Sequence, residues 1–128
     1  MNIREILSQM TLEDKIAFCT GADMWRTKAM HGVGQIMMAD GPHGLRCQRD
    51  ETDFIGINKS LPATCFPAAV TAGSGWNEEL MAAEGEAIGK EALAAGVSAV
   101  LGPGCNIKRN PLGGRSFEYF SEDPYHAG

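Results

Sequence analysis

Two short apolar runs, each ended at once by glycine and proline, constrain the fold of this chain more than any other feature. The first occupies residues 35–39 and is followed by Asp-Gly-Pro, and the second occupies residues 97–101 and is followed by Gly-Pro-Gly. Short apolar runs between turn signals are typical of strands buried on both faces, as in a parallel sheet. A third apolar run at 66–71, with a proline near its start, predicts another strand.

A helical segment separates the last two predicted strands. Asn77 is a favourable N-cap, Glu78 and Glu79 lie in the first turn where the helix dipole favours acids, and Gly96 marks the end. Strand, helix and strand joined by short turns form a βαβ unit, so the sheet is expected to be at least partly parallel.

The two ends of the chain have different signals. Residues 2–20 predict two short helices, with Asn2 and Thr11 placed to cap them and apolar side chains at helical spacing. Residues 105–123 are polar and aromatic and predict a long loop, and a helix is expected to open at Pro124. The fold class predicted from these elements is α/β.

Composition excludes several classes of function. Eleven basic against sixteen acidic residues give a net charge of −5, which argues against nucleic acid as a partner. No apolar run approaches the roughly 20 residues that span a bilayer, so no membrane partner is expected. Because no export signal is visible at the N-terminus, we expect a cytoplasmic protein.

Metal and cofactor sites are not expected either. The four cysteines form no C-x-x-C pair and the three histidines are scattered, so a local zinc site is disfavoured and free thiols are the simplest interpretation. The Gly-Pro-Gly turn at 102–104 lacks the third glycine of a dinucleotide loop, and no P-loop pattern is present. We therefore predict neither a metal nor a cofactor.

Charged side chains gather in two segments that follow predicted strands, at 40–46 and at 102–124. In parallel α/β folds the carboxyl edge of the sheet holds the active site. These segments contain both acids and strong donors: Asp40, His43, Arg46, Lys108, Arg109, Arg115, Glu118, Glu122 and Asp123. Carboxylates accept hydrogen bonds from adjacent hydroxyls and guanidinium groups donate to others, so this mixture suits a neutral ligand rich in hydroxyls.

Structural roles for the same residues stay open at this point. Asp40 precedes Gly-Pro and could organise the turn through its own side chain. The basic residues of the second segment face its acids in sequence, so an ion-pair network is an alternative for most of them. No Ser-His-Asp or Cys-His set is indicated.

Three motifs give the chain a resemblance to a known family. DGPHGLR at 40–46, ATCFP at 63–67 and above all GGRSFEYFSEDP at 113–124 resemble glycoside hydrolase family 3, with the β-glucosidase type as the most similar branch. The resemblance covers essentially the whole chain, including MTLEDKI at 10–16.

The resemblance implies a fold, an activity and a role for two residues. It implies a (β/α)8 TIM-type barrel followed by an α/β sandwich domain, and hydrolysis of β-glycosidic bonds with retention by an Asp nucleophile and a Glu acid/base. Asp40 matches an aspartate that holds sugar hydroxyls in the −1 subsite, and Arg115 matches an arginine that reaches the same sugar. Both carboxylates that carry the reaction are expected beyond residue 128, so no catalytic residue is assigned within the chain.

A barrel of this type takes about 250 residues, so residues 1–128 are interpreted as the first half, a truncated N-terminal portion that lacks the nucleophile and the second domain. Its expected partners are the rest of its own barrel, the second domain and a small carbohydrate substrate. Two alternatives remain: an inactive truncated fragment that binds sugar, or a β-xylosidase or hexosaminidase of the same family.

Overall fold

Two short parallel strands, β1 (Met38–Asp40) and β2 (Ala99–Leu101), organise the part of the chain that carries the polar segments. The structure is a computed structural model that describes residues 2–48 and 59–128. Its helices are α1 (Ile3–Gln9), α2 (Leu12–Cys19), α3 (Ala69–Gly73), α4 (Glu78–Ala94) and α5 (Pro124–Ala127), with a 3-10 turn η1 (Ser116–Glu118). The polar residues at 46–62 predict an irregular loop, and much of that segment lies outside the described residues.

The register of the two strands confirms the predicted parallel pairing. Met38 pairs with Ala99, and Asp40 pairs with Leu101 at the carboxyl end of both strands. β1 begins later than the predicted run at 35–39, because the residues before it pair with an earlier segment. The Thr27 backbone N–H donates to the Ile36 carbonyl oxygen at 3.0 Å, and the Met38 N–H donates to the Trp25 carbonyl oxygen at 2.7 Å.

The strand predicted at 66–71 is wrong. Residues from Ala69 onward form α3, whose first turn closes when the Thr71 and Ala72 backbone N–H groups donate to the Ala68 carbonyl oxygen. A short apolar run cannot distinguish a strand from a buried helical turn by periodicity alone. The βαβ unit is consequently made by β1, α4 and β2.

The predicted helices at both ends of the chain and between the strands are confirmed. The Asn77 side chain accepts from the Leu80 N–H at the start of α4, and Gly96 ends that helix with φ of 73°. Thr11 and Asp14 form a reciprocal capping box on α2. Hydrogen bonds from Thr11, aided by the contact with His31, hold the pKa of Asp14 below its usual value.

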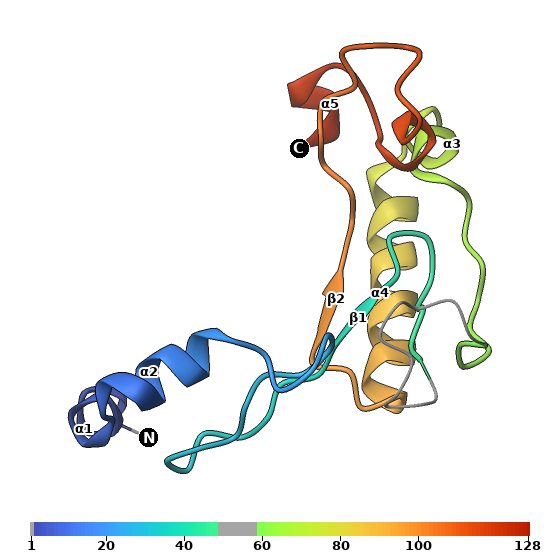
Figure 1. Cartoon of the computed structure of the whole chain (residues 1–128). Helices are drawn as coiled ribbons and strands as arrows, with labels where there is room; N and C mark the ends of the chain where they lie inside the picture. Colours follow the sequence, from blue (N-terminus) through green and yellow to red (C-terminus); the bar gives the residue numbers. More distant parts are fainter. Residues whose placement is uncertain (1, 49–58) are drawn as a thin grey trace.

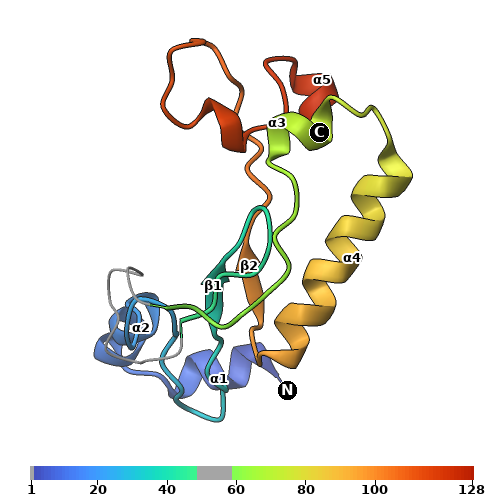
Figure 2. The same cartoon turned by 90° about the vertical axis from the view of Figure 1, so that its right-hand side faces the viewer.

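α4 covers one face of the sheet, and the small core lies between them (Figure 1, Figure 2). That core consists of Ala39, Leu45, Cys47, Ala92 and Val97. Burial raises the pKa of the Cys47 thiol. Within the described residues the strands are not buried on both faces as predicted: Leu101 is 51% exposed, because α4 covers only one side.

Many large apolar side chains lie at the surface of this structure. They include side chains on α1, α2, α4 and β2 as well as on the loop after β2, such as Ile3, Leu12, Leu93, Leu101 and Leu112. Figure 1 shows α1 and α2 projecting away from the sheet. None of the described helices combines the length and the apolar character that crossing a bilayer requires.

This exposure predicts that the 128-residue chain does not pack well by itself. Each large apolar side chain left in water forgoes about 1.5–3 kcal/mol, against a total stability of about 5–15 kcal/mol for a folded domain. We expect the isolated chain to be aggregated, or molten with its near-UV circular dichroism lost. A sharp two-state melt of a monomer with dispersed amide NMR signals would contradict this expectation.

Candidate functional site

The loop that leaves β1, residues 40–46 (the Asp40 loop), turns back on itself immediately. The Arg46 backbone N–H donates to the Asp40 carbonyl oxygen at 2.8 Å, and this bond closes the loop at its base. Asp40 is half-buried at the last position of β1, beside Leu101. The Asp40 backbone is therefore fixed at the end of a strand.

Two glycines allow the Asp40 loop to pack this tightly. Gly41 and Gly44 have φ of 149° and 127°, values that side chains other than glycine rarely adopt. A Cβ added at Gly44 would lie 2.1 Å from the Thr64 carbonyl oxygen, and one added at Gly41 would lie 2.5 Å from the Gly44 carbonyl oxygen. The backbone approaches at both positions leave no room for a side chain.

The loop that leaves β2, residues 102–123 (the Arg115 loop), meets the Asp40 loop at the same edge of the sheet. A Cβ added at Gly102 would lie 2.9 Å from the Pro42 Cα, and the His43 and Phe117 ring centroids are 6.5 Å apart. The prediction that the two polar segments come together at the carboxyl ends of parallel strands is confirmed.

Arg115 lies on this edge just before η1 and is held by its neighbours. Its guanidinium forms an ion pair with Glu118 and lies 6.0 Å from the centre of the Tyr119 ring. The hydrogen bond with Glu118 raises the pKa of Arg115 above its usual value, and the charge of Asp40 adds a smaller contribution in the same direction. Arg115 and Asp40 thus belong to the two loops that meet at this edge of the sheet.

The ion-pair network considered as an alternative is present in part. Arg115 pairs with Glu118, one of the acids in this segment. Asp123 instead caps α5, where its carboxylate accepts from the Tyr125 backbone N–H at 2.9 Å. Because the Arg115 side chain is 76% exposed while Glu118 is 14% exposed, the pairing orients Arg115 and leaves it accessible to a ligand.

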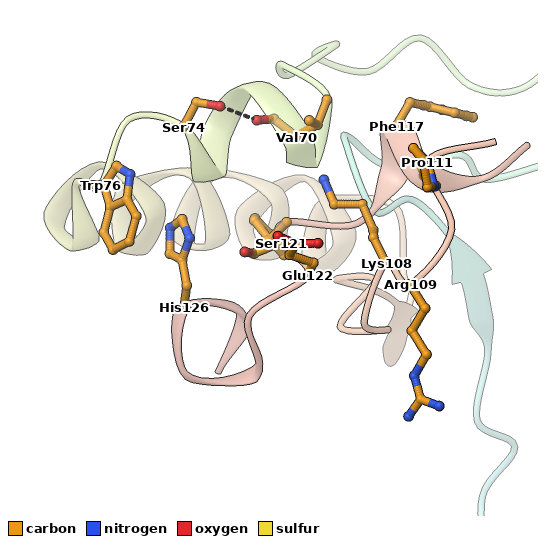
Figure 3. Close-up of a pocket in the computed structure, with 12 residues that line it drawn as sticks. Val70, Ser74, Trp76, Lys108, Arg109, Pro111, Phe117, Ser121, Glu122 and His126 are labelled. Carbon is orange, nitrogen blue, oxygen red and sulfur yellow. Dashed lines mark hydrogen bonds between the residues drawn. The ribbon is translucent and has the colours of Figure 1, made fainter. Parts of the chain in front are cut away.

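A cavity of about 770 Å³ lies next to the Arg115 loop, and neither Asp40 nor Arg115 lines it (Figure 3). It reaches the Arg115 loop at Ser116 and Phe117, directly after Arg115. Figure 3 shows the Lys108 side chain extending toward α3, whereas the Arg109 guanidinium points away from it. Its remaining lining comes from Val70, Ser74, Trp76, Pro111, Phe120, Ser121, Glu122 and His126.

Two contacts between separate elements were not predicted from the sequence. Trp76 and His126 stack with ring centroids 3.7 Å apart, which joins the start of α4 to α5. The Glu91 carboxylate of α4 accepts hydrogen bonds from Thr64. Neither pair has a sequence signal, because its partners come from separate elements. Within the described ranges, no cluster of three or more His, Cys, Asp or Glu side chains could hold a metal.

Comparison with known proteins identifies a family. The model of the glycosyl hydrolase family 3 N-terminal domain matches residues 7–128. The chain is 54% identical over 127 residues to thermostable beta-glucosidase B of Acetivibrio thermocellus, covering 98% of this chain and 17% of that protein. It is 48% identical over 128 residues to an exo-alpha-(1->6)-L-arabinopyranosidase of Bifidobacterium longum, covering 95% of this chain and 16% of that protein.

Solved structures agree with this match. The family 3 beta-glucosidase of Bifidobacterium adolescentis superposes with a TM-score of 0.80 at 47% identity, over 95% of this chain and 17% of that one. The beta-glucosidase of Kluyveromyces marxianus in complex with glucose superposes with a TM-score of 0.89 at 34% identity, over 100% and 15%. The predicted fold class, α/β as the first part of a TIM-type barrel, is confirmed.

The glycine contacts predict a specific loss of stability. We expect Gly44→Ala to lower the free energy of unfolding of the full-length protein by at least about 2 kcal/mol, because the strained φ and the contact with the Thr64 carbonyl oxygen act together. Gly85→Ala is the matched control, since Gly85 lies in α4 with no neighbouring atom within 4 Å, and it should stabilise by roughly 0.5–1 kcal/mol. Equal midpoints of urea denaturation for the two variants would contradict the packing described for the Asp40 loop.

Proposed function

Because the chain belongs to glycosyl hydrolase family 3, we propose that it is the N-terminal portion of the barrel domain of a longer enzyme that hydrolyses β-glycosidic bonds. It spans 17% and 16% of the lengths of the two curated relatives described above. The rest of the barrel and a second domain complete the enzyme in this proposal. The share contributed by residues 1–128 is one side of the −1 sugar subsite.

The observation that carries the proposal is the placement of Asp40 and Arg115 on one edge of the sheet. An ionised carboxylate only accepts hydrogen bonds and can take them from two adjacent hydroxyls, whereas a guanidinium only donates them. Asp40 supplies the first capability from the end of β1, and Arg115 supplies the second with its orientation set by Glu118. A sugar ring offers hydroxyls that satisfy both.

In the proposed reaction these residues bind substrate and do not attack it. A carboxylate nucleophile from the remainder of the enzyme displaces the leaving group at the anomeric carbon, and a carboxylic acid protonates the departing glycosidic oxygen. Water then cleaves the glycosyl-enzyme with the same acid/base residue now accepting a proton, and configuration is retained. The hydrogen bonds that Asp40 accepts from the sugar and that Arg115 donates to it strengthen as the sugar ring distorts, so they favour the transition state over the bound substrate.

We propose a β-glucoside as the substrate, supported by the name of the 54% identical relative and by the glucose bound to the Kluyveromyces marxianus enzyme. An α-L-arabinopyranoside is the second candidate, supported by the name of the Bifidobacterium longum relative at 48% identity. Parallel assays of the full-length protein on the two p-nitrophenyl glycosides distinguish these candidates by their ratio of kcat/KM.

Removing the charge of Asp40 tests the subsite directly. We expect Asp40→Asn to reduce kcat/KM on the preferred p-nitrophenyl glycoside roughly 150-fold, because charge-assisted bonds to the distorted sugar are lost. This reduction corresponds to a loss of about 3 kcal/mol of transition-state stabilisation. Arg115→Lys should also be harmful, since the planar fork is replaced by a point charge. Glu86→Gln is the control, because Glu86 pairs with Lys90 on an exposed face of α4. An Asp40→Asn variant within twofold of the parent would refute the assignment.

The isolated 128-residue chain should have no glycosidase activity. The proposal places the nucleophile and the acid/base residue outside it, so neither the covalent intermediate nor protonation of the leaving oxygen is available. A purified chain that hydrolyses the chromogenic glycoside at a rate proportional to its concentration would show that a reactive pair lies within these residues.

A further inference from the structure

Glu91 of α4 is bonded to a distant segment of the chain through its carboxylate. Both carboxylate oxygens lie 3.2 Å from the Thr64 backbone nitrogen, and one of them accepts from the Thr64 hydroxyl at 2.6 Å. Glu91 is itself half-buried, and the next residue, Ala92, is part of the core. The helix therefore presents this acid from a fixed backbone position.

Thr64 in turn lies directly against the Asp40 loop. Its carbonyl oxygen occupies the space that a Cβ of Gly44 would take, 2.1 Å from that position. Two residues later, the Phe66 backbone N–H donates to the His43 carbonyl oxygen at 2.8 Å. Residues 64–66 thus pack against the Asp40 loop at His43 and Gly44.

The loop has little freedom on its other sides. Its base is closed by the bond from the Arg46 N–H to the Asp40 carbonyl oxygen, and Pro42 contacts Gly102 of the Arg115 loop. A shift of residues 64–66 would break their contacts with His43 and Gly44. The Asp40 loop, and Asp40 with it, would then be free to move.

We propose that Glu91 is a positioning residue. Through its contact with Thr64 it fixes the Asp40 loop, and thereby holds Asp40 in the position from which it binds the ligand. This inference rests on the proposed function, because it assumes that Asp40 binds the sugar. Both Thr64 donors reach the same carboxylate oxygen, and the backbone N–H is also 3.2 Å from the second oxygen. A glutamine keeps the first acceptor but loses the negative charge and replaces the second oxygen with an NH₂ donor, so it should preserve the contact in part.

Kinetics of the full-length protein test the inference, at a temperature where circular dichroism shows every variant to be folded. We expect Glu91→Ala to reduce kcat/KM by about 10- to 100-fold, mostly through kcat, because small misplacements of a transition-state contact have effects of this size. Glu91→Gln should fall between Glu91→Ala and the parent. Glu86→Gln, on the same helix, is the control. Thr64→Ser should rescue most of the activity that Thr64→Val loses, since it restores the hydroxyl.

A double-mutant cycle separates positioning from a general structural role. In an Asp40→Asn background the contact is already lost, so adding Glu91→Ala should cost less than about threefold. If the two effects multiply in full, Glu91 does not act through Asp40 and the inference is overturned.

A second readout does not depend on activity. Glu91→Ala should speed hydrogen exchange at the amides of Thr64 and Phe66, and unchanged exchange there would also overturn the inference. A parent enzyme that cleaves no glycoside would instead contradict the proposed function, so the two failures are distinguishable.

Discussion

The parallel pairing of β1 with β2 is the constraint on which the rest of this structure depends. It places Asp40 beside Leu101 at one edge of the sheet, so that the loops that follow both strands must leave in the same direction. The close approach of Gly102 to Pro42 joins the residues that directly follow this pairing. A shift of one residue would turn the Asp40 side chain to the other face of the sheet.

Much of this arrangement could be predicted from the sequence, because its causes are local. Caps such as Asn77, the helix stop at Gly96 and the turns after both strands identify the elements, and parallel pairing then brings residues 40–46 and 102–124 to one edge. The segment at 66–71 was assigned wrongly, since a few residues of apolar periodicity fit a helical turn as well as a strand. The roles of Asp40 and Arg115 came from a family resemblance and remain predictions.

The contacts that fix the site could not be predicted, because they join residues that are distant in sequence. Glu91 and Thr64 are 27 residues apart, and the geometry that joins them exists only after α4 has packed on the sheet. We propose that the loop containing Gly41 and Gly44 sets the position of Asp40 and that Glu91 on α4 keeps this loop in place. In this proposal the position of Asp40 depends on the contact between α4 and Thr64.

The most direct test is a crystal structure of the full-length protein with its sugar bound. We expect the Asp40 carboxylate to accept hydrogen bonds from two adjacent hydroxyls of the ring, at about 2.5–3.0 Å, and the Arg115 guanidinium to donate to the same sugar. A sugar that binds in the neighbouring cavity, which Lys108 lines, and makes no contact with Asp40 would contradict this expectation.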